Sequence, residues 1–236
     1  MTYVEVLPPV SLSPWLECAW EREGESGAPV RVLPDGCIDL VWTEGAGTQL
    51  VGANTTAFLV TLAPGVRVRG VRLRPGGASS LLGVRPEEVC DVRAPIEEVF
   101  AAEGRRLTDA LATPAGGSPR QVLIDWLLAR SSSAGAPDPI VTAAATQLPR
   151  AGASVRAVAA ELGVSERALR RRVCAAVGYG PKRLARVLRL QCALSAARLG
   201  DDLGRVAFDA GYSDQSHFTN ECRVLAGAPP AALISN

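Results

Sequence analysis

Two groups of polar side chains in the C-terminal third of the chain have the chemistry needed to read DNA bases. The first group is arginines, whose guanidinium forks can bond O6 and N7 of guanine together. The second group contains amides and hydroxyls, which can pair with adenine or bond base edges and phosphates. The first group consists of Arg167, Arg170 and Arg171, and the second consists of Gln215, Ser216, His217, Thr219 and Asn220. We interpret both groups as candidate DNA contacts.

Each group is expected on one face of an amphipathic helix, opposite a buried apolar stripe. The stripes are Leu169, Val173 and Ala176 in the first helix and Phe218, Cys222 and Leu225 in the second. A cationic face on one helix could equally be an ordinary solvated surface. The second helix, with reading chemistry of a different kind, favours DNA contact for both.

His217 and Asp214 have local roles to consider. His217 lies next to the groove-facing positions, where it could contact phosphate, but helix capping or packing explains its position at least as well. Asp214 directly precedes the second helix and is expected to cap it, because a carboxylate near phosphate costs energy.

The residues around both helices follow the pattern of a helix-turn-helix unit. In the first unit Ser154 starts a short helix, Gly163 breaks it, and Ser165 caps the reading helix. In the second unit Gly211 and Tyr212 form the turn. The sequence therefore predicts two helix-turn-helix units in tandem.

Charge is distributed unevenly along the chain. Residues 1–140 carry 12 basic and 17 acidic side chains, whereas residues 141–236 carry 13 basic and 7 acidic ones. The basic residues concentrate between Ser154 and Arg198, and the balance becomes acidic beyond that point. The C-terminal part suits a polyanion, and its first unit is expected to supply most of the phosphate attraction.

The sequence predicts an α+β N-terminal domain, with antiparallel strands first and helices after them, joined to an all-α C-terminal domain. The expected strands are residues 15–20, 30–33, 37–42, 49–51, 57–62 and 66–73, and the expected helices that follow are 78–82, 96–111 and 119–129. The polar segment 131–137 has the composition of a linker. We therefore predict domains at 1–130 and 138–236.

The last expected strand holds apolar residues in two phases. Val68 is out of phase with Val71, so the strand either carries a bulge at Gly70 or changes which face is buried. We predict the bulge, which would turn Arg72 and Arg74 to solvent. Without it, a buried guanidinium would need an anionic partner such as Asp35, Asp39 or a ligand carboxylate.

The candidate effector-binding residues of the N-terminal domain are few. They are Trp15, Trp20, Trp42, Asp35, Arg72 and Arg74. The tryptophans could line a pocket, although tryptophans of a small β-rich domain more often belong to its core. Cys37 is a candidate reactive thiol, but nothing nearby in the sequence would lower its pKa.

The C-terminal part resembles the AraC/XylS family of bacterial transcription regulators from about Ile140 to Leu233. The residues that carry the resemblance are Ala157 to Ala159, Gly163 to Ser165, Leu169, Gly178, Gly180, Pro181, Arg189, Leu190, Gly211 to Phe218, Gly227 and Pro230. The resemblance implies two recognition helices in adjacent major-groove segments, joined by a long helix over residues 182–199. By motif position it implies the base readers named above.

Residues 5–100 resemble a small uncharacterised N-terminal domain found on a branch of these regulators. The matching residues are Leu33 to Leu40, Val51, Gly52, Gly70 to Ala78 and Leu81 to Gly83. This resemblance implies a sensory or dimerising role and names no ligand.

Other classes of protein and site are disfavoured. No apolar run approaches the roughly 20 residues needed to cross a bilayer, and no signal segment follows Met1, so we expect a cytoplasmic protein. The six cysteines are scattered and the chain has one histidine, so no zinc spacing is present and no metal or cofactor is expected.

We conclude from the sequence that the chain is a DNA-binding transcriptional regulator, not an enzyme, with a small-molecule effector on its N-terminal domain. The expected partners are double-stranded DNA and the effector, with RNA polymerase and a second copy of the chain as further candidates. One alternative is a constitutive regulator whose N-terminal domain only dimerises. Another is a sensor modified by redox or alkylation at cysteine, which would need a clustered, activated thiolate.

Overall fold

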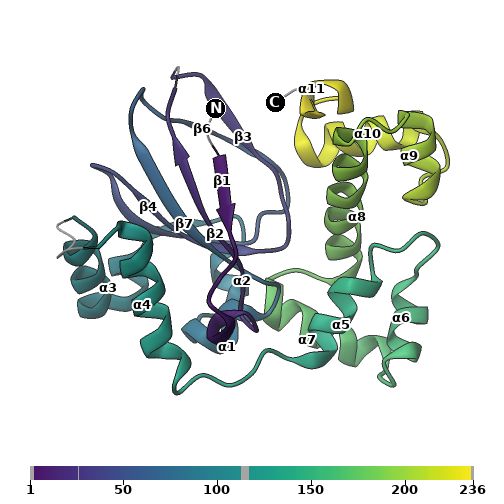
Figure 1. Ribbon diagram of the computed structural model, residues 1–236. Helices are drawn as coiled ribbons and strands as arrows, with labels where there is room; N and C mark the ends of the chain where they lie inside the picture. The colour runs from purple at the N-terminus through teal and green to yellow at the C-terminus, as the bar shows by residue number, and fades with distance from the viewer. Residues whose placement is uncertain (1–2, 26, 113–116, 235–236) are drawn as a thin grey trace.

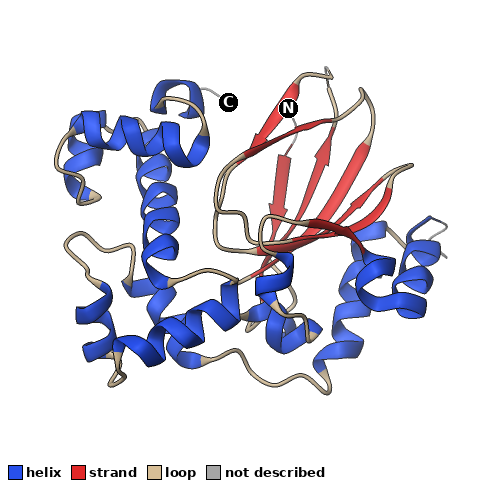
Figure 2. Cartoon of the chain, turned by 180° about the vertical axis from the view of Figure 1, so that it is seen from behind, coloured by secondary structure: helices blue, strands red, loops and turns tan. Residues whose placement is uncertain are grey.

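The N-terminal domain is built on an antiparallel sheet of six strands (Figures 1 and 2). The computed structural model describes residues 3–25, 27–112 and 117–234. In spatial order the strands are β1 (Tyr3–Val6), β2 (Leu16–Glu23), β7 (Arg67–Leu73), β4 (Ile38–Thr43), β5 (Gly47–Val51) and β8 (Arg93–Pro95). A separate two-stranded ribbon pairs β3 (Pro29–Val32) with β6 (Phe58–Thr61). The ribbon lies on the side of the sheet that faces the C-terminal helices.

One face of the sheet forms the core of this domain. Leu40, Leu50 and Val71 on that face are fully buried beneath two helices, α3 (Ile96–Ala112) and α4 (Pro119–Ser131). Ser118 caps α4 by accepting a hydrogen bond from the backbone N–H of Gln121, as expected from the sequence. The remaining short elements of the domain are the 3-10 turn η1 (Val10–Leu12), α1 (Gly77–Leu82) and α2 (Pro86–Val89).

Strand β7 passes through Gly70 without a bulge, so the expected bulge there is wrong. Its pairing with both β2 and β4 runs through Gly70 in unbroken register. The indole ring of Trp20 occupies the space beside Gly70, where an added Cβ would lie 2.3 Å from the ring. Val68 and Arg72 consequently share one face of the strand, and Val71 lies on the other. Apolar residues occur in both phases because both faces are covered.

The C-terminal part is entirely helical in the described residues. Its helices are α5 (Pro139–Gln147), α6 (Val155–Glu161), α7 (Glu166–Val177), α8 (Pro181–Arg198), α9 (Leu203–Asp209), α10 (Gln215–Ala226) and α11 (Pro230–Ile234). Helix α8 stands between two units, with α5–α7 at one end and α9–α11 at the other (Figure 1). We refer to α5–α7 as the first unit and to α9–α11 as the second unit.

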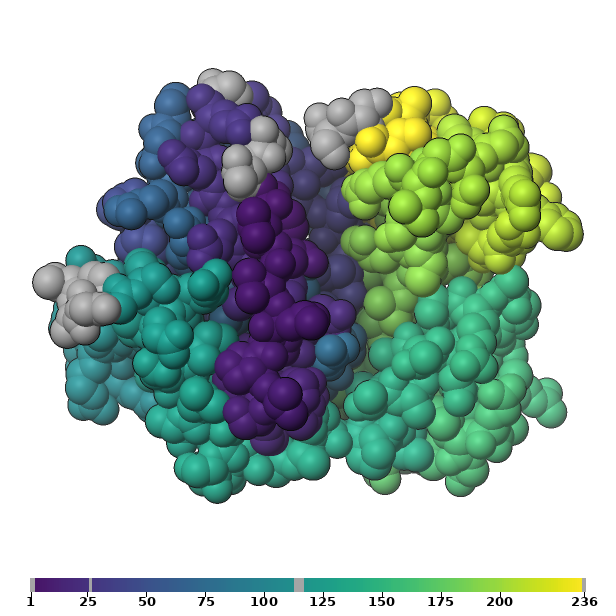
Figure 3. Space-filling view, viewed as in Figure 1, coloured from purple at the N-terminus to yellow at the C-terminus, as the bar shows by residue number. Residues whose placement is uncertain are grey.

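The two units belong to different hydrophobic cores. Val141, Leu169 and Val173 of the first unit share one continuous buried cluster with the sheet and helices of the N-terminal domain. Phe218 and Leu225 of the second unit belong to a smaller cluster with the later turns of α8. In the space-filling view, the first and second units form one side of the molecule and the N-terminal domain forms the other (Figure 3).

The fold class expected from the sequence is confirmed, with an antiparallel β-domain followed by helices and an all-helical C-terminal part. The sequence did not predict β1, β8, α2 or α11, which are short. Segment 131–137 runs from the last residue of α4 toward the start of α5, and one hydrophobic core extends across it. Among the described helices, none combines the length and the hydropathy that a membrane span requires.

Candidate nucleic-acid interface

Helix α7 presents the first group of candidate DNA contacts to solvent. Its N-terminus is capped by Ser165, whose hydroxyl accepts a hydrogen bond from the backbone N–H of Ala168 at 3.2 Å. The side chains of Arg167, Arg170 and Arg171 are exposed, while the opposite stripe of the helix is buried. Within the described residues, none of these three arginines has an ion-pair partner, so their guanidinium groups are available to a ligand.

Helix α10 presents the second group in the same way. Asp214 caps it, because the Asp214 carboxylate accepts a hydrogen bond from the backbone N–H of His217. Phe218 lies fully buried beneath the helix. Gln215, Ser216 and Asn220 are exposed, and Thr219 is half-buried. The candidates other than His217 therefore form one accessible amide and hydroxyl face.

His217 is held by its neighbours in the turn. Its Nδ1 lies 3.1 Å from the Ser213 hydroxyl and accepts a hydrogen bond from the Ser213 backbone N–H at 3.3 Å. Its ring also packs edge-on against Tyr212, with 5.2 Å between the ring centroids. These contacts give His217 a role in fixing the start of α10.

One ion pair holds α10 to α8, and another lies inside the first unit. Arg186 of α8 makes two parallel hydrogen bonds to Glu221 of α10, at 2.7 and 2.8 Å, and Glu221 is only 8% exposed. In the first unit, Arg172 of α7 binds Asp138 at the start of α5 at 2.6 Å, in a more exposed setting. The buried fork fixes the rotation of α10 about its own axis, because both guanidinium nitrogens must face the carboxylate.

The N-terminal domain also bonds directly to α8 and α10. Gln191 of α8 donates to the Pro34 carbonyl at 2.7 Å. At the end of α10, the Ala57 backbone N–H donates to the Leu225 carbonyl at 2.7 Å, and Arg31 of β3 donates to the Ala226 carbonyl at 2.9 Å. The second unit therefore meets the N-terminal domain through backbone carbonyls at the end of its recognition helix.

A cavity of about 400 Å³ lies between the sheet and the β3–β6 ribbon. Its apolar wall comes from the sheet and the ribbon, and α8 closes one side with Gln191 and Arg198. A second hollow of about 570 Å³ adjoins it and shares Arg22, Arg31 and Arg198 as lining residues. The apolar side chains of the first cavity include Val30, Val41, Phe58, Val60, Leu62 and Val68.

The polar side of the cavity is centred on Arg72. Its Nε lies 3.1 Å from Asp35 and 3.3 Å from Asp39, and Trp20 donates from its indole nitrogen to Asp39 at 3.1 Å. Burial raises the pKa of Asp39 to about 6 although Arg72 acts to lower it. Burial opposes the charge of Arg72, but Asp39 and Asp35 outweigh it and raise the pKa of the guanidinium. The predicted bulge would have turned Arg72 to solvent, whereas in the structure it has carboxylate partners inside the cavity.

The candidate effector residues lie in three places. Trp20, Asp35 and Arg72 line the cavity. Trp15 and Trp42 are buried in the main core, and the indole nitrogen of Trp15 donates to the Gly135 carbonyl in the segment after α4. Arg74 follows the end of β7, where it pairs with Glu17 and donates to the Leu16 carbonyl at 2.9 Å. The structure thus brings together three of the six.

Cys37 lies beside this polar cluster and is not activated by it. Its Sγ is 3.9 Å from the Asp35 carbonyl oxygen, and burial raises the pKa of the thiol well above its ordinary value. In the described part of the chain, no three His, Cys, Asp or Glu side chains are grouped so as to hold a metal ion.

Comparison with known families decides the identity of both parts. Residues 158–236 match the family described as a helix-turn-helix domain, and residues 4–95 match a domain of unknown function (DUF6597). The C-terminal part of the chain belongs to this helix-turn-helix family, and the chain is a DNA-binding transcription regulator, not an enzyme. Among curated proteins, no significant relative is found.

Solved structures of ToxT share the fold. ToxT from Vibrio cholerae is 9% identical, with a TM-score of 0.51, over 92% of this chain and 96% of that one. An apo variant of ToxT is 10% identical, with a TM-score of 0.52 and the same coverage. An AraC-type regulator from Chromobacterium violaceum is 23% identical over 41% of this chain and 90% of its own, with a TM-score of 0.39. The ToxT matches extend the likeness in fold across both parts of the chain.

Sequence reasoning missed the residues that join the parts of this regulator. Arg31, Gln191 and Glu221 make the contacts described above, yet none of them belongs to a motif. Glu221 alone left a signal, because it interrupts the buried side of an otherwise amphipathic helix.

Proposed function

We propose that α7 and α10 read adjacent major-groove segments on one face of the DNA. The observation that carries the proposal is the placement of the candidate readers. They are exposed on two helices at opposite ends of α8, while the opposite stripe of each helix is buried. Helix α8 spans 18 residues, about 27 Å at 1.5 Å per residue, which is close to one turn of DNA.

The two helices would read different bases. Arg167, Arg170 and Arg171 have the forked geometry for guanine, whereas Gln215 and Asn220 suit adenine. Ser216 and Thr219 can bond either base edges or phosphates. His217 is already engaged with Ser213, so we assign it the role of orienting the turn.

We further propose that the cavity of the N-terminal domain binds a small-molecule effector. Its volume of about 400 Å³ falls within the range of ordinary ligand sites, and it combines apolar walls with a few converging polar groups. Trp20, Asp35 and Arg72 are the proposed contacts. A domain that served only for dimerisation would not need this cavity, so its presence favours a sensor over a constitutive regulator.

The alternative of a cysteine-modified sensor is less well supported. A modifiable cysteine needs a lowered pKa, whereas the pKa values of Cys18, Cys37, Cys90 and Cys222 are all raised, each mainly by burial. RNA polymerase, a second copy of the chain and a cytoplasmic location stay predictions from the sequence.

Mobility shift with the purified chain, across a salt series and with random DNA as competitor, tests the DNA-reading proposal. The target would be double-stranded DNA selected from a randomised pool by the wild-type protein. We expect a footprint of about two helical turns and a steep fall in affinity with salt. Binding that shows no preference for the selected sequence would contradict the proposed base readers.

A further inference from the structure

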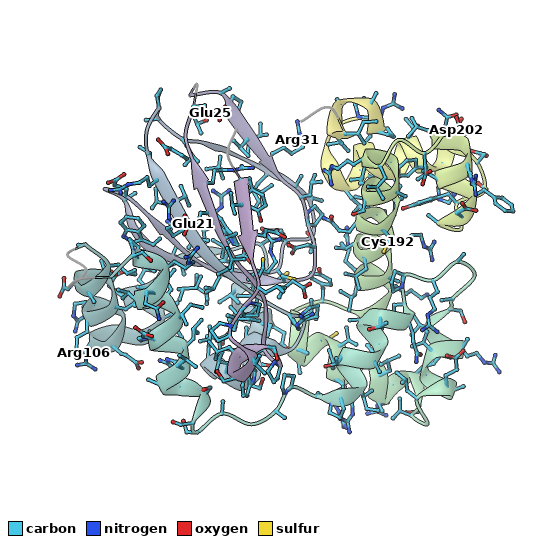
Figure 4. All side chains as sticks on the ribbon, in the orientation of Figure 1. Glu21, Glu25, Arg31, Arg106, Cys192 and Asp202 are labelled. Atoms are coloured by element: carbon cyan, nitrogen blue, oxygen red, sulfur yellow. The ribbon has the colours of Figure 1, made fainter. Side chains whose placement is uncertain are left out.

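Arg31 lines the cavity of the N-terminal domain and also donates a hydrogen bond to the C-terminal end of α10. It lies on β3 and points toward the helices of the second unit (Figure 4). Its Nη1 donates to the Ala226 carbonyl, the last carbonyl of α10, across 195 residues of sequence. The guanidinium packs so closely there that a Cβ added at Gly227 would lie 2.9 Å from Nη1.

The end of α10 depends on the N-terminal domain for its hydrogen bonds. The last carbonyls of a helix have no partner within the helix and carry a partial negative charge. Here Gly227 satisfies the Arg223 carbonyl, Ala57 satisfies that of Leu225, and Arg31 satisfies that of Ala226. Two of these three donors come from the N-terminal domain, and Arg31 is the one that also brings a positive charge.

Within the described residues, the second unit shares little apolar packing with the N-terminal domain. Its apolar residues belong to a cluster of their own, in which Leu33 is the only partly buried N-terminal residue among those described. The first unit, in contrast, shares the main core. A polar contact at the end of α10 therefore has a large share in setting where this helix lies relative to α7.

We propose that Arg31 is a positioning residue for DNA binding by the second unit, and that cavity occupancy acts on α10 through it. The effect of cavity occupancy on α10 rests on the proposed effector function. Arg31 lines both the cavity and the adjoining hollow, so a ligand that accepts hydrogen bonds from it engages the same guanidinium that holds Ala226. Cavity and recognition helix thus share one side chain.

The test compares Arg31→Met with Arg22→Met by footprinting on the selected DNA. Arg22 is the matched control because it lines the same cavity and hollow and stacks over Tyr3, and no bond from it to the second unit is present in the described residues. We expect Arg31→Met to bind roughly ten-fold more weakly and to lose protection over the half contacted by α10. The half contacted by α7 should stay protected, and Arg22→Met should retain both halves.

Arg31→Lys provides the rescue, since an ammonium group can keep both the charge and the donor at Ala226. We expect it to restore the two-turn footprint. Three results would overturn the proposal: an unchanged footprint in Arg31→Met, equal loss in both halves, or global unfolding of Arg31→Met, which would make Arg31 a general stability residue.

Hydrogen exchange without DNA separates this proposal from the proposed function. Amides near the end of α10, in residues 221–227, should exchange faster in Arg31→Met than in Arg22→Met, while those of α7 should not change. If the wild type failed to prefer any DNA sequence, the base-reading proposal would fail, and the exchange result would still decide whether Arg31 holds α10. Equal exchange in the two variants would refute the link.

Discussion

The two helix-turn-helix units have the same local design but are attached to the N-terminal domain in different ways. The first unit is part of the main hydrophobic core, packed against α1 and α2. The second has a small core of its own. It meets the N-terminal domain where Arg31 and Ala57 donate hydrogen bonds to the last carbonyls of α10. The first unit is thus packed as an extension of the N-terminal domain. Moving the second unit would break few contacts with that domain.

The N-cap residues of the two helix-turn-helix units also differ, in their charge. Ser154 and Ser165 cap α6 and α7, the two helices of the first helix-turn-helix, whereas Asp202 and Asp214 cap α9 and α10. Helix α5, which precedes the first helix-turn-helix, is capped by Asp138. A carboxylate at a helix N-terminus offsets the positive end of the helix dipole that would otherwise attract phosphate. The first unit also carries the concentrated arginines, so it should supply most of the affinity and the second should refine the choice of site.

The largest effects should come from substitutions that separate the two cores. Leu169→Ala and Phe218→Ala each remove a fully buried side chain, at a cost of about 3 and 4 kcal/mol. All four tryptophans lie in residues 1–130, so their fluorescence reports on the main core. We expect Leu169→Ala to lower the tryptophan unfolding midpoint, and Phe218→Ala to lose helical circular dichroism before the tryptophan signal changes. Equal effects on the tryptophan midpoint would show that the units unfold as one.

A smaller difference in unfolding free energy is expected between two ion pairs, one that joins α8 to α10 and one inside the first unit. Glu221→Gln leaves a half-buried Arg186 facing a neutral partner, at a cost of about 2 kcal/mol. Asp138→Asn is the matched change in the first unit, where the pair is more exposed and should contribute below about 1 kcal/mol. Urea unfolding followed by circular dichroism measures both. A larger loss for Asp138→Asn would reverse the comparison.

Among the proposed DNA contacts, loss of a charged side chain of α7 should weaken DNA binding more than loss of a neutral side chain of α10. Arg171→Ala should cost about 1.5 kcal/mol, or some ten-fold in affinity, and relax the preference at one base pair. Asn220→Ala should weaken binding only roughly two- to three-fold, because the second unit adds less attraction. Competition with single-base-pair variants of the selected DNA measures both. An unchanged base preference in Arg171→Ala would reject its reading role.

A further effect is a pH dependence that belongs to the cavity. The pKa of Asp39 is about 6 in the folded protein, above the ordinary value of about 3.9 expected on unfolding. The folded state therefore holds this proton more tightly, and the contribution of Asp39 to stability falls as pH rises from about 4 to 6. Asp39→Asn should remove this component of the urea midpoint, and Trp20 fluorescence should titrate near pH 6 only in the wild type. Identical pH profiles would contradict the assignment.

Local features of the fold could be predicted from the sequence because they depend on neighbouring residues. The caps at Ser118, Ser154, Ser165 and Asp214 are all present, since each depends on a side chain and an amide two or three residues away. The exposed faces of α7 and α10 followed from helical periodicity for the same reason.

Contacts between distant segments could not be predicted in this way. The Gly70 error arose because the ring of Trp20, 50 residues earlier in the chain, fills the place of a side chain and keeps the strand regular. The bond from Arg31 to Ala226 joins residues that no local pattern relates. Trp15 and Trp42 look like Trp20 in the sequence, and only the packing of the sheet decides which of them borders the cavity.

The core shared by the N-terminal domain and the first unit has a practical consequence for building chimeric regulators. Exchange at segment 131–137 would cut through that core, so a transplanted α5–α7 would bring apolar side chains that do not match the sheet domain. A junction between Arg198 and Leu203 would instead cut the smaller core, which joins the later turns of α8 to the second unit. A grafted second unit would then need apolar side chains that match α8, a carboxylate opposite Arg186 and a glycine beside Arg31.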